Sequence, residues 1–207
     1  GSSLFPFIEA GSSDLYVVPR FATAFLDPFA EIPTLSMLCS FFNKDGEPLA
    51  SAPRYTLLKA LNAFEEVTGM QFEAMGELEY YVIAPDEGLF PATDQKGYHE
   101  SAPYAKFNEF RQECMAFIAQ AGGQIKYGHS EVGNFTIDGK IYEQNEIEFL
   151  PVAAADAADQ LVIAKWIIRN LAYRYGFDIT FAPKITAGKA GSGLHIHMRI
   201  MKDGKNM

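Results

Sequence analysis

The amino-acid sequence predicts a domain that mixes strands and helices, of the α/β or α+β class. Strand-like and helix-like segments follow one another along the whole chain, and no fixed-period repeat interrupts them. The 207 residues, with a mass of 22.9 kDa, suffice for one generous domain. A composition of 48% hydrophobic and 14% aromatic residues supplies a sizeable core. These patterns leave both fold classes open.

Short strands are predicted near the N-terminus, at residues 15–18, 25–26 and 35–42. The third of them runs into the sequence Asn-Lys-Asp-Gly at residues 43–46, in which Gly46 supplies a positive φ. We therefore expect a tight reversal at that point.

A first helix is predicted over residues 54–68. Pro53 occupies its first position and Gly69 follows it as a C-terminal stop. Its apolar side chains fall on one stripe, which indicates a structural role: Leu57, Leu58, Leu61 and Phe64. A strand at 72–83 and a polar surface loop at 85–98 are expected next.

The second half of the chain repeats this alternation. A helix that ends at Gly122 and a longer one that begins near a capping Asp156 and ends at Gly176 are the predicted helices. Asp138 and Gly139 form a predicted turn between two strands. The expected helices span 104–121 and 156–175, and the expected strands span 124–131, 142–150, 177–181 and 194–201.

The excess of acidic over basic residues argues against some classes of binding partner. The 26 Asp and Glu outnumber the 17 Lys and Arg, so the chain lacks a broad basic surface for nucleic acid or an anionic membrane. No apolar run of about 18 residues and no signal peptide is visible, and Cys39 and Cys114 lie outside any metal-ligand spacing. We therefore expect a cytoplasmic protein that binds neither nucleic acid nor a membrane.

Carboxylates recur at strand spacing in two places. Glu77 and Glu79 lie two residues apart in a strand of large apolar residues, so both point to one face. Glu146 and Glu148 share a face in the same way, and Glu131 ends the preceding strand. Taken one strand at a time, each set is predicted to be a solvated face.

Two histidines share a strand face near the C-terminus. His195 and His197 alternate with two aliphatic residues, so their imidazoles can flank one site. Combined with the glutamates, they form an oxygen and nitrogen ligand set of the kind that suits Mg²⁺ or Mn²⁺. Several carboxylates in one cavity repel one another unless cations neutralise them, which favours two ions over one.

The run Gly-Ser-Gly-Leu-His-Ile-His at residues 191–197, followed by Lys-Asp-Gly-Lys-Asn at 202–206, closely resembles the ATP-binding signature of the glutamine synthetase family. Residues 76–80, 129–132 and 144–147 resemble the family's metal-binding strands, in order. This resemblance covers nearly the whole chain. It implies an α+β fold in which helices flank a curved antiparallel sheet, the front part of the family's catalytic domain.

The resemblance also implies a division of the chain. Residues 1–13 resemble the tail of the family's N-terminal β-grasp domain, and residues 14–207 the N-terminal portion of the catalytic domain, without its C-terminal portion. The catalytic residues themselves are expected beyond Met207. We therefore expect the 207-residue chain alone to be inactive.

The implied activity is ATP-dependent ligation of ammonia to the γ-carboxylate of glutamate through γ-glutamyl phosphate, with two Mg²⁺ or Mn²⁺ ions. By resemblance, one ion is held by Glu79, Glu131 and Glu146, and the other by Glu77 and His195. Gly191 matches a substrate-binding position. His197 and Arg199 match positions in the segment that contacts the nucleotide in the family.

Several positions depart from the family's common pattern. Glu131 and Glu146 are 15 residues apart, a longer spacing than usual, and residues 134–142 form a predicted inserted hairpin. Lys126 replaces a nucleotide-binding acid, and Ala190 replaces an asparagine beside the substrate. Two alternatives therefore stay open: a γ-glutamyl ligase for a larger amine, and a non-catalytic family member. The complete protein is expected to form a homo-oligomeric ring.

Overall fold

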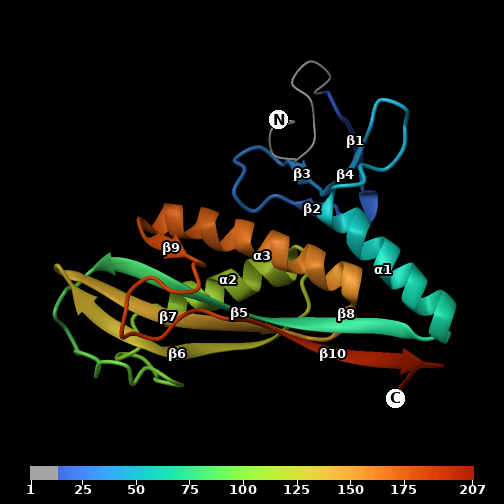
Figure 1. The fold of residues 1–207 in the computed structure, drawn as a ribbon. Helices are drawn as coiled ribbons and strands as arrows, with labels where there is room; N and C mark the ends of the chain where they lie inside the picture. Colours follow the sequence, from blue (N-terminus) through green and yellow to red (C-terminus); the bar gives the residue numbers. More distant parts are fainter. Residues whose placement is uncertain (1–13) are drawn as a thin grey trace.

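The computed structural model describes residues 14–207, and its centre is a seven-stranded antiparallel sheet. The main strand order is β11-β10-β5-β7-β6, while β8 and β9 also pair with β5 (Figure 1). The α+β class and the curved antiparallel sheet are confirmed. The strands are β5 (Gln71–Pro85), β6 (Ile125–Ile137), β7 (Lys140–Phe149), β8 (Val152–Ala153), β9 (Asp178–Thr180), β10 (Leu194–Lys202) and β11 (Lys205–Asn206).

Two helices cover one face of this sheet. Helices α2 (Asn108–Gln120) and α3 (Ala154–Tyr175) lie above β5 and β7 in Figure 1. Alternate residues of the strands point toward them, because successive side chains of a strand face opposite sides. The core that results is fully buried at its centre and includes Leu78, Tyr80, Val82, Phe110, Ile147, Ile167, Ile168 and Leu171. Among residues 14–207, no helix packs against the opposite face of the sheet, which we call the helix-free face.

A small N-terminal layer sits on the outer side of α3. It consists of β1 (Tyr16–Pro19), η3 (Phe21–Thr23), β2 (Phe25–Leu26), β3 (Leu35–Ser36) and β4 (Cys39–Phe42), followed by α1 (Pro53–Thr68). Arg20 and Arg54 both donate hydrogen bonds to the carboxylate of Asp159 on α3. The shortest N···O distance is 2.6 Å for each arginine. This shared carboxylate fastens the layer to the helix. The predicted domain tail at residues 1–13 lies outside the described residues.

Most predicted elements are present, but several boundaries were wrong. The strand predicted at 35–42 is two strands, because β3 pairs with β2 whereas β4 pairs with β1. Helix α3 begins at Ala154, and its N-cap Ala153 makes no side-chain cap, so Asp156 lies inside the first turn. Helix α2 starts four residues after the predicted position.

The hairpin between β6 and β7 is longer than predicted. Both strands continue to the turn at Asp138 and Gly139, which have φ of 50° and 72°. Pairing runs to Ile137 opposite Lys140, so residues 134–142 form the outer end of one continuous hairpin. Phe135 and Tyr142 stack across it, with ring centroids 4.8 Å apart.

None of the helices described between residues 14 and 207 combines the length and apolar character needed to span a membrane. Both cysteines are free thiols, and Cys114 is buried in the core between α2 and the sheet.

Candidate metal centre

The helix-free face of the sheet gathers the predicted ligands. Glu79 of β5 lies directly opposite Glu146 of β7, and Glu77 lies opposite Glu148. On the other side of β5, His195 of β10 pairs with Glu77. The side chains of Glu79, Glu146 and Glu148 are only 5–7% exposed. The prediction that these glutamates form solvated strand faces was therefore wrong, because neighbouring strands and a loop enclose them.

A bulge in β6 brings Glu131 to the same face. Ser130 pairs with Asn145 and Asn134 pairs with Glu143, so three residues of β6 stand opposite Gln144 alone. Gly133 closes the bulge, and its N–H donates to Gln144 Oε1 at 3.0 Å. A β-carbon on Gly133 would lie 1.8 Å from the Tyr81 hydroxyl oxygen, so only glycine fits without rearrangement.

Gln144 also fastens the glycine-rich loop to the sheet. Its Nε2 donates to Glu79 Oε2 at 2.7 Å and to the Gly191 carbonyl at 2.9 Å. The Gly193 N–H donates to the same Glu79 oxygen at 2.9 Å. Tyr81 adds a hydrogen bond from its hydroxyl to the Ala190 carbonyl, at 2.8 Å. One oxygen of Glu79 thus has two donors, and Oε1 remains to face the centre.

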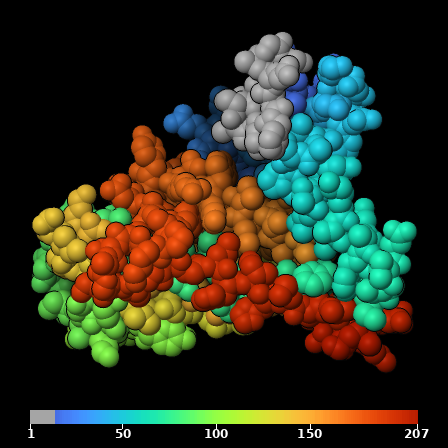
Figure 2. Space-filling view, in the orientation of Figure 1, coloured from blue at the N-terminus to red at the C-terminus, as the bar shows by residue number. Residues whose placement is uncertain are grey.

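The two histidines of β10 flank Glu77. His195 Nδ1 lies 3.2 Å from Glu77 Oε2 and 3.7 Å from Glu79 Oε1, and His197 Nε2 lies 2.8 Å from Glu77 Oε1. Arg199, two residues farther along β10, donates to Glu73 at 2.6 Å. Figure 2 shows this strand and the preceding loop, in red tones, lying at the surface. The nucleotide-binding candidates therefore follow the ligand cluster along one exposed strand.

The electrostatics of the face show a surplus of negative charge. Burial, together with the neighbouring Glu79 and Glu131, raises the pKa of Glu146 to about 8. Burial also raises the pKa of Glu79, although the hydrogen bond from Gly193 opposes the shift. Glu146 therefore tends to hold a proton where no cation lies beside it.

Glu148 differs because the chain supplies it with a cation. Burial acts to raise its pKa, but hydrogen bonds from Lys126 and Tyr127 outweigh that effect, so the pKa lies below its ordinary value. Lys126 Nζ is 2.8 Å from Glu148 Oε2. A second irregularity in β6, between Ile125 and Tyr127, lies at Lys126.

The donor set fits a divalent metal ion. Ligand atoms of His129, Glu131 and Glu146 all lie within 4.8 Å of one another, and so do those of Glu77, Glu146 and Glu148. Carboxylate oxygens with one or two imidazoles are the ligands expected for Mg²⁺ or Mn²⁺. Such ions would also neutralise the mutual repulsion of the buried glutamates.

The structure places the predicted metal ligands Glu77, Glu79, Glu131, Glu146 and His195 on one face, with Gly191 and His197 beside them. The two groups whose ligand atoms lie within 4.8 Å of one another contain Glu77, Glu131 and Glu146 but neither Glu79 nor His195. Sequence reasoning missed two members. Glu148 shares a strand face with Glu146, which was a usable signal. His129 was left out of both predicted ligand sets, although it precedes Glu131 by two residues.

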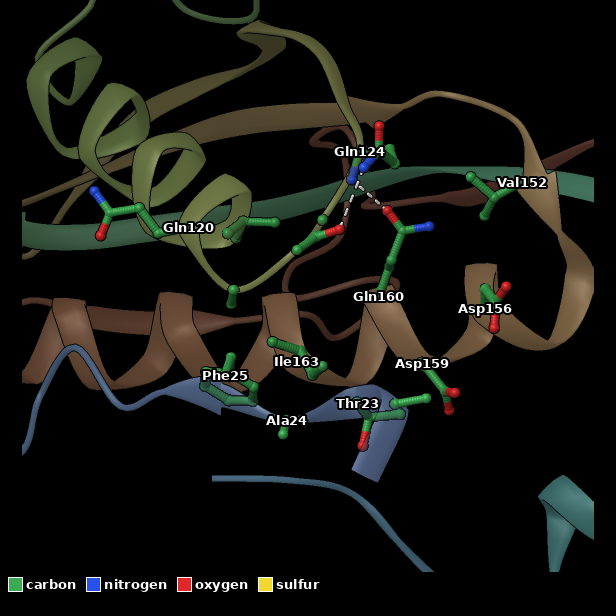
Figure 3. Close-up of a pocket in the computed structure, with 15 residues that line it drawn as sticks. Thr23, Ala24, Phe25, Gln120, Gln124, Val152, Asp156, Asp159, Gln160 and Ile163 are labelled. Atoms are coloured by element: carbon green, nitrogen blue, oxygen red, sulfur yellow. Dashed lines mark hydrogen bonds between the residues drawn. The ribbon is translucent and has the colours of Figure 1, made fainter. Parts of the chain in front are cut away.

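A separate cavity of about 590 Å³ lies on the helix side of the sheet, away from these ligands. η3, the C-terminal end of α2 and the N-terminal half of α3 enclose it (Figure 3). The Gln124 N–H donates to Gln160 Oε1 at 2.5 Å across its wall. Its lining includes no member of the metal-facing set.

Comparison with known proteins agrees with this arrangement. The family of the glutamine synthetase catalytic domain matches residues 50–207. The glutamine synthetases of Thermus thermophilus and Clostridium saccharobutylicum are each 30% identical over the whole chain. Among solved structures, glutamine synthetase of Plasmodium falciparum superposes with a TM-score of 0.86 at 20% identity over the whole chain, and apo GmaS with 0.81 over 97% of it.

The chain spans about half the length of these proteins: 46% of each of the two bacterial enzymes and 45–46% of the two solved structures. Within that span, the motif-bearing strands, the sheet order and the ligand cluster occur together. The chain therefore belongs to the glutamine synthetase catalytic-domain family.

Proposed function

We propose that the whole protein is an ATP-dependent carbon–nitrogen ligase that joins ammonia to the γ-carboxylate of glutamate through γ-glutamyl phosphate. The observation that supports this proposal most is that five predicted ligands share one partly buried face of the sheet: Glu77, Glu79, Glu131, Glu146 and His195. Family membership supports it, since the matched relatives are glutamine synthetases.

Two divalent ions fit this face. Glu79, Glu131 and Glu146 would hold the first and Glu77 and His195 the second, with Mg²⁺ or Mn²⁺ as the ion. When bound, such ions neutralise phosphate oxygens and stabilise charge that develops during phosphoryl transfer. The hydrogen bonds from Gln144 and Gly193 fix Glu79 so that only Oε1 turns to the centre.

The reaction has two steps. A glutamate γ-carboxylate oxygen attacks the γ-phosphorus of ATP and ADP leaves; the nitrogen of ammonia then attacks the acyl carbon, inorganic phosphate leaves, and the amide loses a proton. The Gly191 backbone lies beside Glu79, where it would hold the amino group of the substrate. His197 and Arg199 would contact the nucleotide from the exposed strand β10.

Activity requires more than the described cluster, in this proposal. The chain matches less than half of each of these relatives, and the resemblance places the catalytic residues in the remainder. We expect the 207 residues to bind metal without completing the ligation. We also propose that the whole protein assembles as a homo-oligomeric ring.

A larger amine is the second candidate for the nitrogen donor. The outer β6–β7 hairpin places Phe135 5.8 Å from the ring of Tyr81, whose hydroxyl holds the Ala190 carbonyl next to Gly191. Lys189 lies over the same Phe135 ring, 5.5 Å from its centroid. This aromatic wall beside the loop is a reason to test primary amines as well as ammonia.

Manganese binding to the 207-residue chain tests the proposal. Titration followed by the EPR signal of free Mn²⁺ should reveal two bound ions. Glu79→Gln should remove the first and His195→Gln the second, while the exposed Glu66→Gln on α1 should change neither. Absence of Mn²⁺ binding, or binding that all variants share, contradicts the metal centre and favours a non-catalytic family member.

The donor is tested on the whole protein. Phosphate release that depends on glutamate and ATP should rise with ammonia as the added nitrogen compound. A rise with a primary amine, and none with ammonia, would replace ammonia by the second candidate. No release with either would contradict the ligase.

A further inference from the structure

His129 is the buried imidazole of the metal-facing side that the family resemblance does not assign to a ligand set. It lies on β6, directly opposite Glu146 and two residues before Glu131. Only 8% of its surface is exposed. Its Nε2 is 3.3 Å from Glu146 Oε2 and 3.9 Å from Glu148 Oε1.

The hydrogen bonds of the ring determine which nitrogen faces the carboxylates. His129 Nδ1 lies 2.9 Å from the carbonyl oxygen of Ser130, which also accepts the His99 N–H at 2.9 Å. A carbonyl oxygen only accepts hydrogen bonds, so Nδ1 must carry the proton. In the neutral ring, Nε2 then directs a lone pair at Glu146 Oε2. Nε2 and an ionised Glu146 would both be acceptors, so a proton or a metal ion must lie between these two atoms.

Aromatic neighbours hold the ring in this orientation. His99 stacks on His129 with ring centroids 4.2 Å apart and planes 16° apart, and Tyr98 packs edge-on at 5.5 Å. Because the ring is clamped on its faces, Nε2 points toward the glutamates without side-chain rearrangement. A metal-bound histidine typically donates its other N–H to a backbone carbonyl or a carboxylate, as Nδ1 does here.

We propose that His129 Nε2 is a nitrogen ligand of the first metal ion, together with Glu131 and Glu146. This inference rests on the metal centre of the proposed function. The three ligand atoms lie within 4.8 Å of one another, so one ion could reach all three. Glu79 contributes at most Oε1, since Oε2 is engaged, which leaves a position that a nitrogen can fill.

Pulsed EPR of bound Mn²⁺ tests this ligand directly. The double variant His195→Gln/His197→Gln of the 207-residue chain removes the two imidazoles near Glu77 and leaves the His129 environment intact. After labelling with ¹⁵N-histidine, its remaining Mn²⁺ should show a ¹⁵N coupling. Adding His129→Gln should abolish the coupling and weaken Mn²⁺ binding about tenfold or more.

His99→Gln is the matched control. This exposed histidine is the other imidazole left in the double variant and belongs to neither ligand group. The contacts of the His129 ring with Tyr98, Tyr127 and the Ser130 carbonyl remain without it, so the variant should keep the ¹⁵N coupling and bind Mn²⁺ within about threefold of the parent. Circular dichroism verifies that each variant is folded.

The outcomes separate the two proposals. Mn²⁺ bound by the double variant without a ¹⁵N coupling would overturn the role of His129 and leave the metal centre standing; this is the result if His129 only forms an ion pair with Glu146. No Mn²⁺ binding by the unmodified chain would instead overturn the proposed function. Because the coupling is measured with His129 present, a misfolded His129→Gln variant does not affect the test.

Discussion

Strand β7 carries two buried glutamates that face opposite sides of the sheet, and their surroundings differ completely. Glu143 points to the helices, where its carboxylate accepts the Lys106 and Phe107 N–H groups just before α2, at 2.7 and 3.3 Å. Glu146 points to the helix-free side, where its neighbours are Glu79, Glu131 and His129.

The difference between Glu143 and Glu146 shows how a buried carboxylate with a structural role differs from one that can bind a cation. Burial raises the pKa of Glu143, but its hydrogen-bond donors belong to the chain itself. The pKa of Glu146 rises to about 8 because burial is compounded by other carboxylates, and the compensating charge must come from a proton or a bound cation. A buried acid surrounded by acids therefore indicates a binding site better than burial alone.

Replacing each of these two carboxylates by an amide should produce the largest difference in metal affinity between the two faces. Glu146→Gln removes a ligand, and we expect Mn²⁺ binding at the first site to weaken about 100-fold, equivalent to about 2.7 kcal/mol. Without metal, the same variant should be more stable than the parent at neutral pH, because folding no longer requires this side chain to take up a proton or to stay charged among other carboxylates. Isothermal titration calorimetry and urea unfolding measure the two quantities.

Glu143→Gln is the matched control on the opposite face. Its Mn²⁺ affinity should stay within about threefold of the parent, while its free energy of unfolding should fall by about 1–2 kcal/mol, because an amide NH₂ group meets the α2 N–H donors. Equal losses of Mn²⁺ affinity in the two variants would contradict the distinction.

Replacing Arg111, on the helix-facing side of the sheet, should lower the free energy of unfolding. It is buried on α2 and donates to Asn145 of β7 and Ser130 of β6. Arg111→Met leaves these groups without their donor, so we expect the free energy of unfolding to fall by about 2 kcal/mol. Urea unfolding measures it. Lys59→Met, on the exposed side of α1, should stay within about 0.5 kcal/mol of the parent.

The remaining prediction concerns the pH dependence of stability. Folded Glu146 holds its proton up to about pH 8, whereas the unfolded chain releases it near 4.5. The folded state therefore binds more protons in that window, and the stability of the metal-free chain should fall as pH rises from 4.5 to 8. Saturating Mn²⁺ should reverse the slope, because the ion displaces the proton.

Thermal melts between pH 5 and 9 measure this effect, with EDTA or with Mn²⁺. The difference between the parent and Glu146→Gln isolates the contribution of this residue. If the two metal-free chains change in parallel across the window, Glu146 does not titrate as predicted.

Local patterns predicted most of the fold, and tertiary pairing decided the rest. Helix α1 was predicted to within one residue, because Pro53 and Gly69 act through the backbone itself. The strand predicted at 35–42 proved to be two, since a strand-like pattern cannot show that its halves pair with different partners. Helix α2 begins late for a similar reason: Glu143, distant in sequence, binds the N–H groups just before it.

The candidate site divides in the same way. The alternation of Glu77 with Glu79, and of His195 with His197, assigned each pair to one strand face. Nothing local predicted that these faces meet, and each strand taken alone favoured a solvated surface. The family resemblance supplied the missing connection, but it gave His129 no role and did not show that Lys126 neutralises Glu148.

The sequence by itself determined the order and type of the main elements and the residues able to bind metal, because periodicity, turn residues and side-chain chemistry act over a few positions. Only the tertiary structure decided that four strands place those residues together, that a bulge turns Glu131 inward, and that Glu146 is buried among other carboxylates. These properties depend on register and burial, which arise between segments up to about 120 residues apart.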